Sequence, residues 1–213
     1  MLRLLCFGAA MLLATGTVLA DDGFRPLTEW RSYRGTGIPA SWHIADGVIT
    51  HSGGDGDLVS IETFANFELD FEWKISAGGN SGVMFRVDER YPAPYQSGPE
   101  YQILDNATAS GGNVPLTSAA SDYGLYAPTA DLTKQAGEWN SARLIVNGSH
   151  VEHWLNGQMV VSYELGSADW RARVAGSKFA AWPEYGIAPS GHIDLQDHPG
   201  EVAFRNLLIK PLP

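Results

Sequence analysis

The residues best suited to chemistry lie near the C-terminus, where Gly191–Asn206 reads GHIDLQDHPGEVAFRN. Successive side chains of a β-strand point to opposite faces. Alternation therefore places Ile193 and Leu195 together on one face. The other face carries four hydrogen-bonding side chains: His192, Asp194, Gln196 and His198. We predict that this polar face is one wall of a binding or catalytic site, because a merely solvated face more often carries Thr, Lys, Glu and Ser.

A second polar pair lies in Gly98–Asp105, which reads GPEYQILD. Glu100 and Gln102 share one face of this predicted strand, opposite two apolar side chains. The Glu100 carboxyl group is able to act as a base or as an acid. Exposed carboxylates on strands are also common, so a plain solvated role for Glu100 stays open.

Cations and loop aromatics complete the candidate set. Arg86 shares a predicted strand face with Gly82 and Met84, where a guanidinium group is able to bind an anion or sugar hydroxyls. An ion pair with one of the 24 acidic residues is the structural alternative. Three loop residues are further candidates: Lys178 as a second cation, and Tyr123 and Trp182 as rings that stack on a sugar or cover the core.

A divalent metal is an alternative use of the same residues. His192, Asp194 and His198, together with Glu100, are ligand types that such an ion accepts. However, side chains at i and i+2 of a strand are spread ~7 Å apart. The spacing is therefore not that of a compact metal-binding motif, and the sequence leaves metal binding undecided.

The elements that must position these residues are short β-strands. Phe67–Lys74 alternates apolar and charged residues, as a half-buried strand does. The pairs Asp46-Gly47, Asn147-Gly148 and Asn156-Gly157 separate apolar runs and predict hairpin turns. The only helical signal is a short one over Asp169–Arg173. This pattern predicts one antiparallel β domain, a sandwich or jelly roll of about a dozen strands.

The first twenty residues are expected to be a Sec-type signal peptide. Arg3 precedes the apolar run Leu4–Leu13, and Val18–Ala20 has the small-x-small form of a cleavage site. This run is too short for a membrane span. Cys6 is the single cysteine and lies within this segment, so the remaining residues 21–213 contain no thiol. We expect a bacterial periplasmic or secreted protein.

The charge balance bears on partners. The chain has 24 acidic and 14 basic residues and a net charge of −10. This balance argues against nucleic acid and anionic lipid as partners. Its seven Trp, eight Tyr and eight Phe suit a turn-rich β protein and also suit the binding of sugars.

Several of these stretches together resemble a known family, the 3-keto-disaccharide hydrolase domain. The resemblance runs from about Phe24 to Pro213 and rests on FELDFEWK, PEYQILD, GEWN, HWLNG and GHIDLQDH in this order. It implies an all-β, concanavalin-like jelly roll of two curved antiparallel sheets. It also implies cleavage of glycosides whose C3 hydroxyl has been oxidised to a ketone, by hydrolase or lyase action.

This resemblance gives the candidate residues specific roles. A ketone at C3 acidifies the C2 hydrogen, so a base can form an enolate that expels the aglycone from C1, and water can then add. His198 is the first candidate for the base, Glu100 is the alternative base or the acid, and Arg86 is placed at the enolate. The expected substrate-binding residues are Gln102, Gln196, Lys178, Asp194, His192, Tyr123 and Trp182.

Two other functions stay open. The same fold carries carbohydrate-binding modules without turnover. A conventional glycosidase would need two carboxyl groups flanking the bond, and no paired-carboxylate strand is evident. The enzyme interpretation depends on one geometric expectation, namely that Glu100 and His198 line a common hollow.

Overall fold

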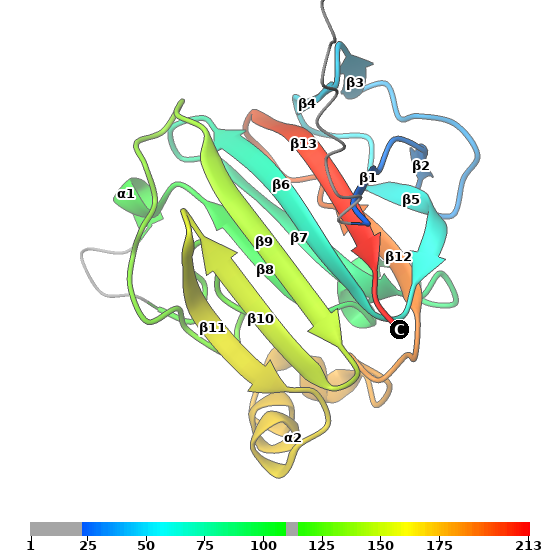
Figure 1. Cartoon of the computed structure of the whole chain (residues 1–213), viewed down its shortest axis with the longest axis vertical. Helices are drawn as coiled ribbons and strands as arrows, with labels where there is room; N and C mark the ends of the chain where they lie inside the picture. Colours follow the sequence, from blue (N-terminus) through cyan, green and yellow to red (C-terminus); the bar gives the residue numbers. More distant parts are fainter. Residues whose placement is uncertain (1–22, 110–114) are drawn as a thin grey trace, which may run out of the picture.

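The computed structural model describes residues 23–109 and 115–213, which form two antiparallel β-sheets packed face to face (Figure 1). All the strand pairs within these residues are antiparallel, which confirms the predicted class of fold. The predicted signal peptide, residues 1–20, lies outside the described residues. None of the described helices is long and apolar enough to cross a membrane.

The larger sheet has eight strands and faces the viewer in Figure 1. Its order is β11 (Gln158–Glu164), β10 (His150–Leu155), β9 (Asn140–Asn147), β6 (Phe67–Ile75), β13 (Val202–Pro211), β4 (Val48–His51) and β3 (Trp42–Ala45), with β1 (Arg25–Pro26) also paired to β13. The turns predicted at Asp46-Gly47, Asn147-Gly148 and Asn156-Gly157 connect neighbouring strands of this sheet, which confirms the three hairpins.

The smaller sheet has five strands and lies behind the larger one. Its order is β2 (Trp30–Ser32), β5 (Leu58–Phe64), β12 (Gly191–Leu195), β7 (Asn80–Val87) and β8 (Glu100–Leu104). The helical elements are two α-helices, α1 (Asn106–Ala109) and α2 (Ala168–Ala175), and two 3₁₀ turns, η1 (Pro94–Gln96) and η2 (Lys178–Ala181). Helix α2 contains the short helix expected at Asp169–Arg173.

The core fills the space between the two sheets. In β6 the apolar side chains are buried and the charged ones between them are half-buried, as the alternation predicts. Phe67 meets Phe85 of β7 edge-on with ring centroids 6.4 Å apart, and Phe71 meets Tyr101 of β8 at 5.4 Å. These contacts fix which face of β7 and β8 points inward, and so which face is left for a site.

Candidate functional site

The outer face of the smaller sheet carries a row of polar side chains across three strands. Met84 of β7 pairs with Asp194 of β12 on one side and with Glu100 of β8 on the other. Their sequence neighbours Ile193 and Tyr101 belong to the core, so these three side chains point away from the larger sheet. The structure therefore brings together Asp194 and Glu100, which the sequence placed on separate strands.

A second row lies directly beside the first. Gly82 pairs with Gln102, and the backbone N–H of Gln196 donates to the carbonyl oxygen of Gly82 at 2.9 Å. Leu195 pairs with Leu58 of β5, and continuing this register places Asp57 next to Gln196. The four residues of this row span about three strand spacings, roughly 14 Å.

This polar face is buried. Glu100, Gln102 and Asp194 are only 4%, 2% and 0% exposed. Loop segments cover them: the backbone N–H of Tyr123 donates to the Glu100 carbonyl at 3.0 Å, and the Gln102 amide donates to the carbonyl of Thr117 at 3.3 Å. Burial of polar groups is costly unless they are hydrogen-bonded, and carboxyl groups with perturbed pKa values cluster at functional sites, so this face is a candidate ligand site.

The Glu100 side chain extends over Gly82 toward the centre of the face. A Cβ atom built on Gly82 would lie 2.4 Å from Oε1 of Glu100. Burial raises the pKa of Glu100 to about 8, with a smaller contribution from Asp57, while Lys178 and a hydrogen bond from Gln196 act in the opposite direction. Near neutral pH Glu100 is therefore mostly protonated and able to donate a proton.

Asp57 supplies a carboxyl group of different acidity. Burial raises its pKa to about 6; the backbone N–H of Asp197 lowers it and the Asp197 charge raises it. That N–H donates to Asp57 Oδ1 at 2.6 Å. Near neutral pH Asp57 is mostly ionised, so the site contains one carboxylate that can accept a proton and one carboxylic acid that can donate one.

Asp194 is the third carboxyl group on this face. Its side chain is fully buried, and neither oxygen has a hydrogen-bond partner among the described residues. Burial, reinforced by Asp57 and Glu100, raises its pKa well above the ordinary value. Burial therefore favours the protonated form of Asp194, and its two oxygens are unpaired polar atoms within the face.

Lys178 is close enough to Glu100 to affect its pKa and lies near a group of aromatic rings. The Lys178 ammonium is 4.3 Å from the ring centroid of Tyr123 and 5.7 Å from that of Tyr95. Trp182, which follows η2, meets Tyr95 edge-on at 5.5 Å. Burial lowers the pKa of Lys178, and the nearby Glu100 opposes this shift. The structure thus brings the predicted residues Lys178, Tyr123 and Trp182 into one group.

A pocket of about 210 Å³ adjoins Asp57. Tyr33 and the loop from Pro92 to Pro94 form its walls, together with Ser32, Asp55 and Gly56. The Tyr33 hydroxyl donates to the carbonyl of Tyr91 at 2.7 Å and so fixes this loop against the sheet edge. Asp57 therefore has an open volume beside it in which part of a substrate fits.

Arg86 lies elsewhere, which corrects the predicted strand face. β7 contains an extra residue between Met84 and Val87, because these two pair with Asp194 and His192. Arg86 sits in this bulge with φ of 53°. Its Nη2 donates to the carbonyl of Ala65 (3.2 Å), in the turn that connects β5 to β6, and to that of Gly148 (2.7 Å), in the β9–β10 hairpin turn. Its guanidinium group therefore holds turns together and is not directed at the Glu100 face.

The two histidines of the GHIDLQDH stretch do not join the carboxyl groups. His192 Nδ1 lies 2.7 Å from the carbonyl oxygen of Ser60, and Nε2 lies 3.4 Å from Arg31, which pairs with Glu89 at 2.6 Å. His198 is exposed, because β12 ends at Leu195 and the chain turns away. The strand alternation on which the His198 assignment rested therefore ends before it reaches this residue.

Among the described residues, we find no set of side chains that is placed to ligate a metal ion. Within residues 23–109 and 115–213, no group of three or more His, Asp and Glu side chains is placed to hold an ion. The predicted combination of His192, Asp194, His198 and Glu100 is dispersed in the way just described.

Asp57 and Tyr33 are site residues that the sequence reasoning missed. Asp57 ends a glycine-rich loop that has no strand period, and its place beside Gln196 depends on the pairing of β5 with β12. One feature of the sequence does point to Asp57: the apolar run that starts at Leu58 makes Asp57 the last residue before a buried strand.

Comparison with known proteins gives consistent matches. A family model described as the 3-keto-alpha-glucoside-1,2-lyase-like domain matches residues 17–210. The 3-keto-disaccharide hydrolase of Bacteroides thetaiotaomicron is 34% identical over an alignment of 231 positions, which covers 93% of this chain and 79% of that protein.

Solved structures also resemble this chain. A candidate glycosyl hydrolase from Parabacteroides distasonis superimposes with a TM-score of 0.82 at 36% identity, covering 90% of this chain and 94% of that one. The carbohydrate-binding module CBM66 from Bacillus subtilis gives a TM-score of 0.55 at 14% identity over 86% of this chain and 96% of that one, which shows a shared jelly-roll fold alone.

Proposed function

Because the chain belongs to the 3-keto-alpha-glucoside-1,2-lyase-like family, we propose that it cleaves 3-keto-glycosides by removing the C2 proton and eliminating the aglycone. The observation that carries this proposal is the buried outer face of the smaller sheet, where Asp57, Asp194 and Glu100 surround Gly82 and Met84. Such a face offers a base and an acid within the reach of one sugar ring.

In the proposed reaction Asp57 is the base. Its carboxylate takes the C2 hydrogen as a proton, and the C2–H electron pair forms the enolate with the C3 ketone. The enolate then expels the C1 oxygen, which receives a proton from Glu100. Water adds to C1 of the resulting unsaturated 3-keto sugar and C2 regains a proton, so that the net change is hydrolysis; without this last step the enzyme is a lyase.

Other residues stabilise the charge and hold the ring. The Lys178 ammonium is the group that binds the developing enolate oxygen, because it is the cation beside Glu100. Gln102, Gln196 and Asp194 are assigned to sugar hydroxyls, and Tyr123 and Trp182 to packing against the ring. The assignment of His198 as the base stays a prediction. The exposed position of His198 favours Asp57 for this role.

The test is incubation with a 3-keto-disaccharide and with its unoxidised parent. We expect sugar release only from the oxidised compound, and loss of release in Asp57→Asn and Glu100→Gln. Cleavage of the parent would point to a conventional glycosidase. Binding of the keto compound without release would point to a carbohydrate-binding module, and either result would contradict the proposal.

We further propose that this reaction takes place outside the cytoplasm, in the periplasm or after secretion. The basis is the predicted signal peptide over residues 1–20. The mature protein from an exporting bacterial host should begin at Asp21, as read by mass spectrometry, and an intact N-terminus in the exported fraction would contradict it.

A further inference from the structure

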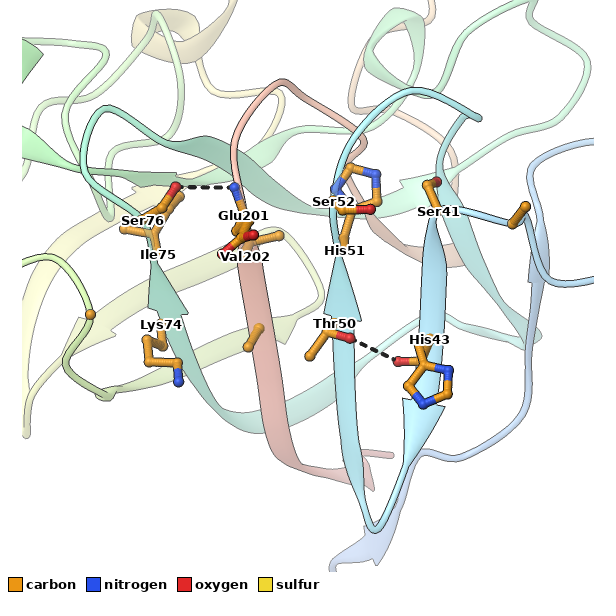
Figure 2. A pocket seen from close by; sticks show the side chains of 13 residues that line it. Ser41, His43, Thr50, His51, Ser52, Lys74, Ile75, Ser76, Glu201 and Val202 are labelled. Atoms are coloured by element: carbon orange, nitrogen blue, oxygen red, sulfur yellow. Dashed lines mark hydrogen bonds between the residues drawn. The ribbon is translucent and has the colours of Figure 1, made fainter.

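Another histidine, His51, is buried at the end of β4 in the larger sheet and has no role in the reaction steps given above. It ends β4 beside a hollow of about 530 Å³ on the larger sheet, where β3, β4, β6 and β13 come together (Figure 2). His51 is 2% exposed and its ring packs on Trp42 with centroids 4.2 Å apart. Burial lowers its pKa, which favours the neutral ring.

His51 is connected to a residue of the other sheet. Its Nε2 lies 3.0 Å from Oδ1 of Asp197, which follows β12. The same Asp197 carboxylate accepts hydrogen bonds from the backbone N–H groups of Gly54 at 2.9 Å and Gly56 at 2.7 Å. Asp197 therefore binds the glycine-rich loop that leads into Asp57.

This attachment holds the loop together with the indole N–H of Trp42, which donates to the Gly56 carbonyl at 2.9 Å. Gly53, Gly54 and Gly56 have φ values of 94°, 114° and 95°, which glycine adopts readily and other residues do not. Because glycine also leaves the chain flexible, fixed contacts must define where the loop ends. The contact nearest to the site is the Asp197 N–H, which donates to Asp57 Oδ1 at 2.6 Å.

We propose that His51 and Asp197 are positioning residues for Asp57: the imidazole holds the Asp197 carboxylate, that carboxylate fixes the loop, and the Asp197 N–H orients the Asp57 carboxylate. This inference rests on the proposed function of Asp57 as base. It assigns a role in the reaction to a histidine on the larger sheet, behind the hollow in Figure 2.

The test is His51→Ala, with His43→Ala as the matched control. His43 lines the same hollow, but its side chain is exposed on β3. His51→Ala should lower kcat about 10- to 100-fold with little change in KM, since a small displacement of a reacting group costs this much. The acid limb of the pH profile should move to higher pH, because displacement of Asp197 weakens the backbone hydrogen bond that lowers the pKa of Asp57.

A conservative substitution separates positioning from general damage. His51→Gln offers an amide N–H to Asp197 and is the variant to use if His51→Ala does not fold; it should retain most activity. A folded His51→Ala protein with wild-type kcat and pH profile would overturn the inference.

Amide hydrogen exchange gives a measurement that does not depend on catalysis. In His51→Ala the amides of Gly54, Gly56 and Asp197 should exchange faster than in the wild type. Wild-type exchange at these amides, with Asp57→Asn inactive, would overturn this inference alone. Full activity of Asp57→Asn would overturn the assignment of the base, and the role proposed for His51 with it.

Discussion

Glu100→Gln is expected to stabilise the protein near neutral pH while it abolishes activity. The folded protein holds Glu100 with a pKa of about 8, against an ordinary value of 4.5. Between these two pH values the unfolded chain has lost the proton and the folded protein keeps it. The folded state then binds more protons, so the free energy of unfolding falls as pH rises through this window.

The magnitude follows from the shift. One pH unit is worth about 1.4 kcal/mol inside the window, so the contribution of Glu100 should fall by roughly 2.5 kcal/mol between pH 5 and pH 7. A glutamine has no charge to desolvate and fills nearly the same space. The unfolding free energy of the Glu100→Gln variant should therefore rise relative to that of the wild type by about this amount over the same pH range.

The assay is urea unfolding of both proteins at pH 5, 6, 7 and 8. The difference in unfolding free energy should widen steadily with pH and level off above about pH 8, where Glu100 is ionised in both states. Taking the difference removes the contributions of the other carboxyl groups. Parallel curves for the two proteins would refute the claim that burial holds Glu100 in its protonated form.

Four further variants or profiles test the same geometry. Gly82→Ala should abolish turnover and leave folding intact, because the new Cβ would lie 2.4 Å from Oε1 of Glu100 and displace it; a fully active variant would contradict this placement. The pH profile of kcat should be bell-shaped, rising near pH 6 as Asp57 ionises and falling near pH 8 as Glu100 loses its proton, and a single limb would count against the pair. Arg86→Met should lower the unfolding free energy by about 1–3 kcal/mol, because two turn carbonyls lose their donor, yet it should leave the kcat of the folded protein unchanged. His198→Ala should retain wild-type kcat, and its inactivity in a folded protein would restore His198 as the base.

The sheet elements were predictable where local pattern decides the structure. Phe67–Lys74 alternates because one face packs on the other sheet, and the Asn-Gly and Asp-Gly pairs specify hairpin turns. The same alternation correctly put Asp194 and Gln196 on the face that meets Glu100. This much of the candidate site follows from the two-residue period of a strand.

The remaining site residues depend on features that no local pattern reveals. An extra residue in β7 turns Arg86 away from Met84, and a bulge leaves the alternation of residue types unchanged. The end of β12 at Leu195 removes His198 from the polar face. Asp57 enters the site only through the pairing of β5 with β12, a contact between segments more than a hundred residues apart.

The central claim is that cleavage proceeds through loss of the C2 proton. The most direct measurement is the reaction of a 3-keto-disaccharide in D₂O, with an enzyme-free control for background exchange and the C2 position of the released sugar followed by NMR. The account predicts that the 3-keto sugar produced by the wild type carries deuterium at C2, and that Asp57→Asn produces none. Release of a sugar that keeps its original C2 hydrogen would contradict it.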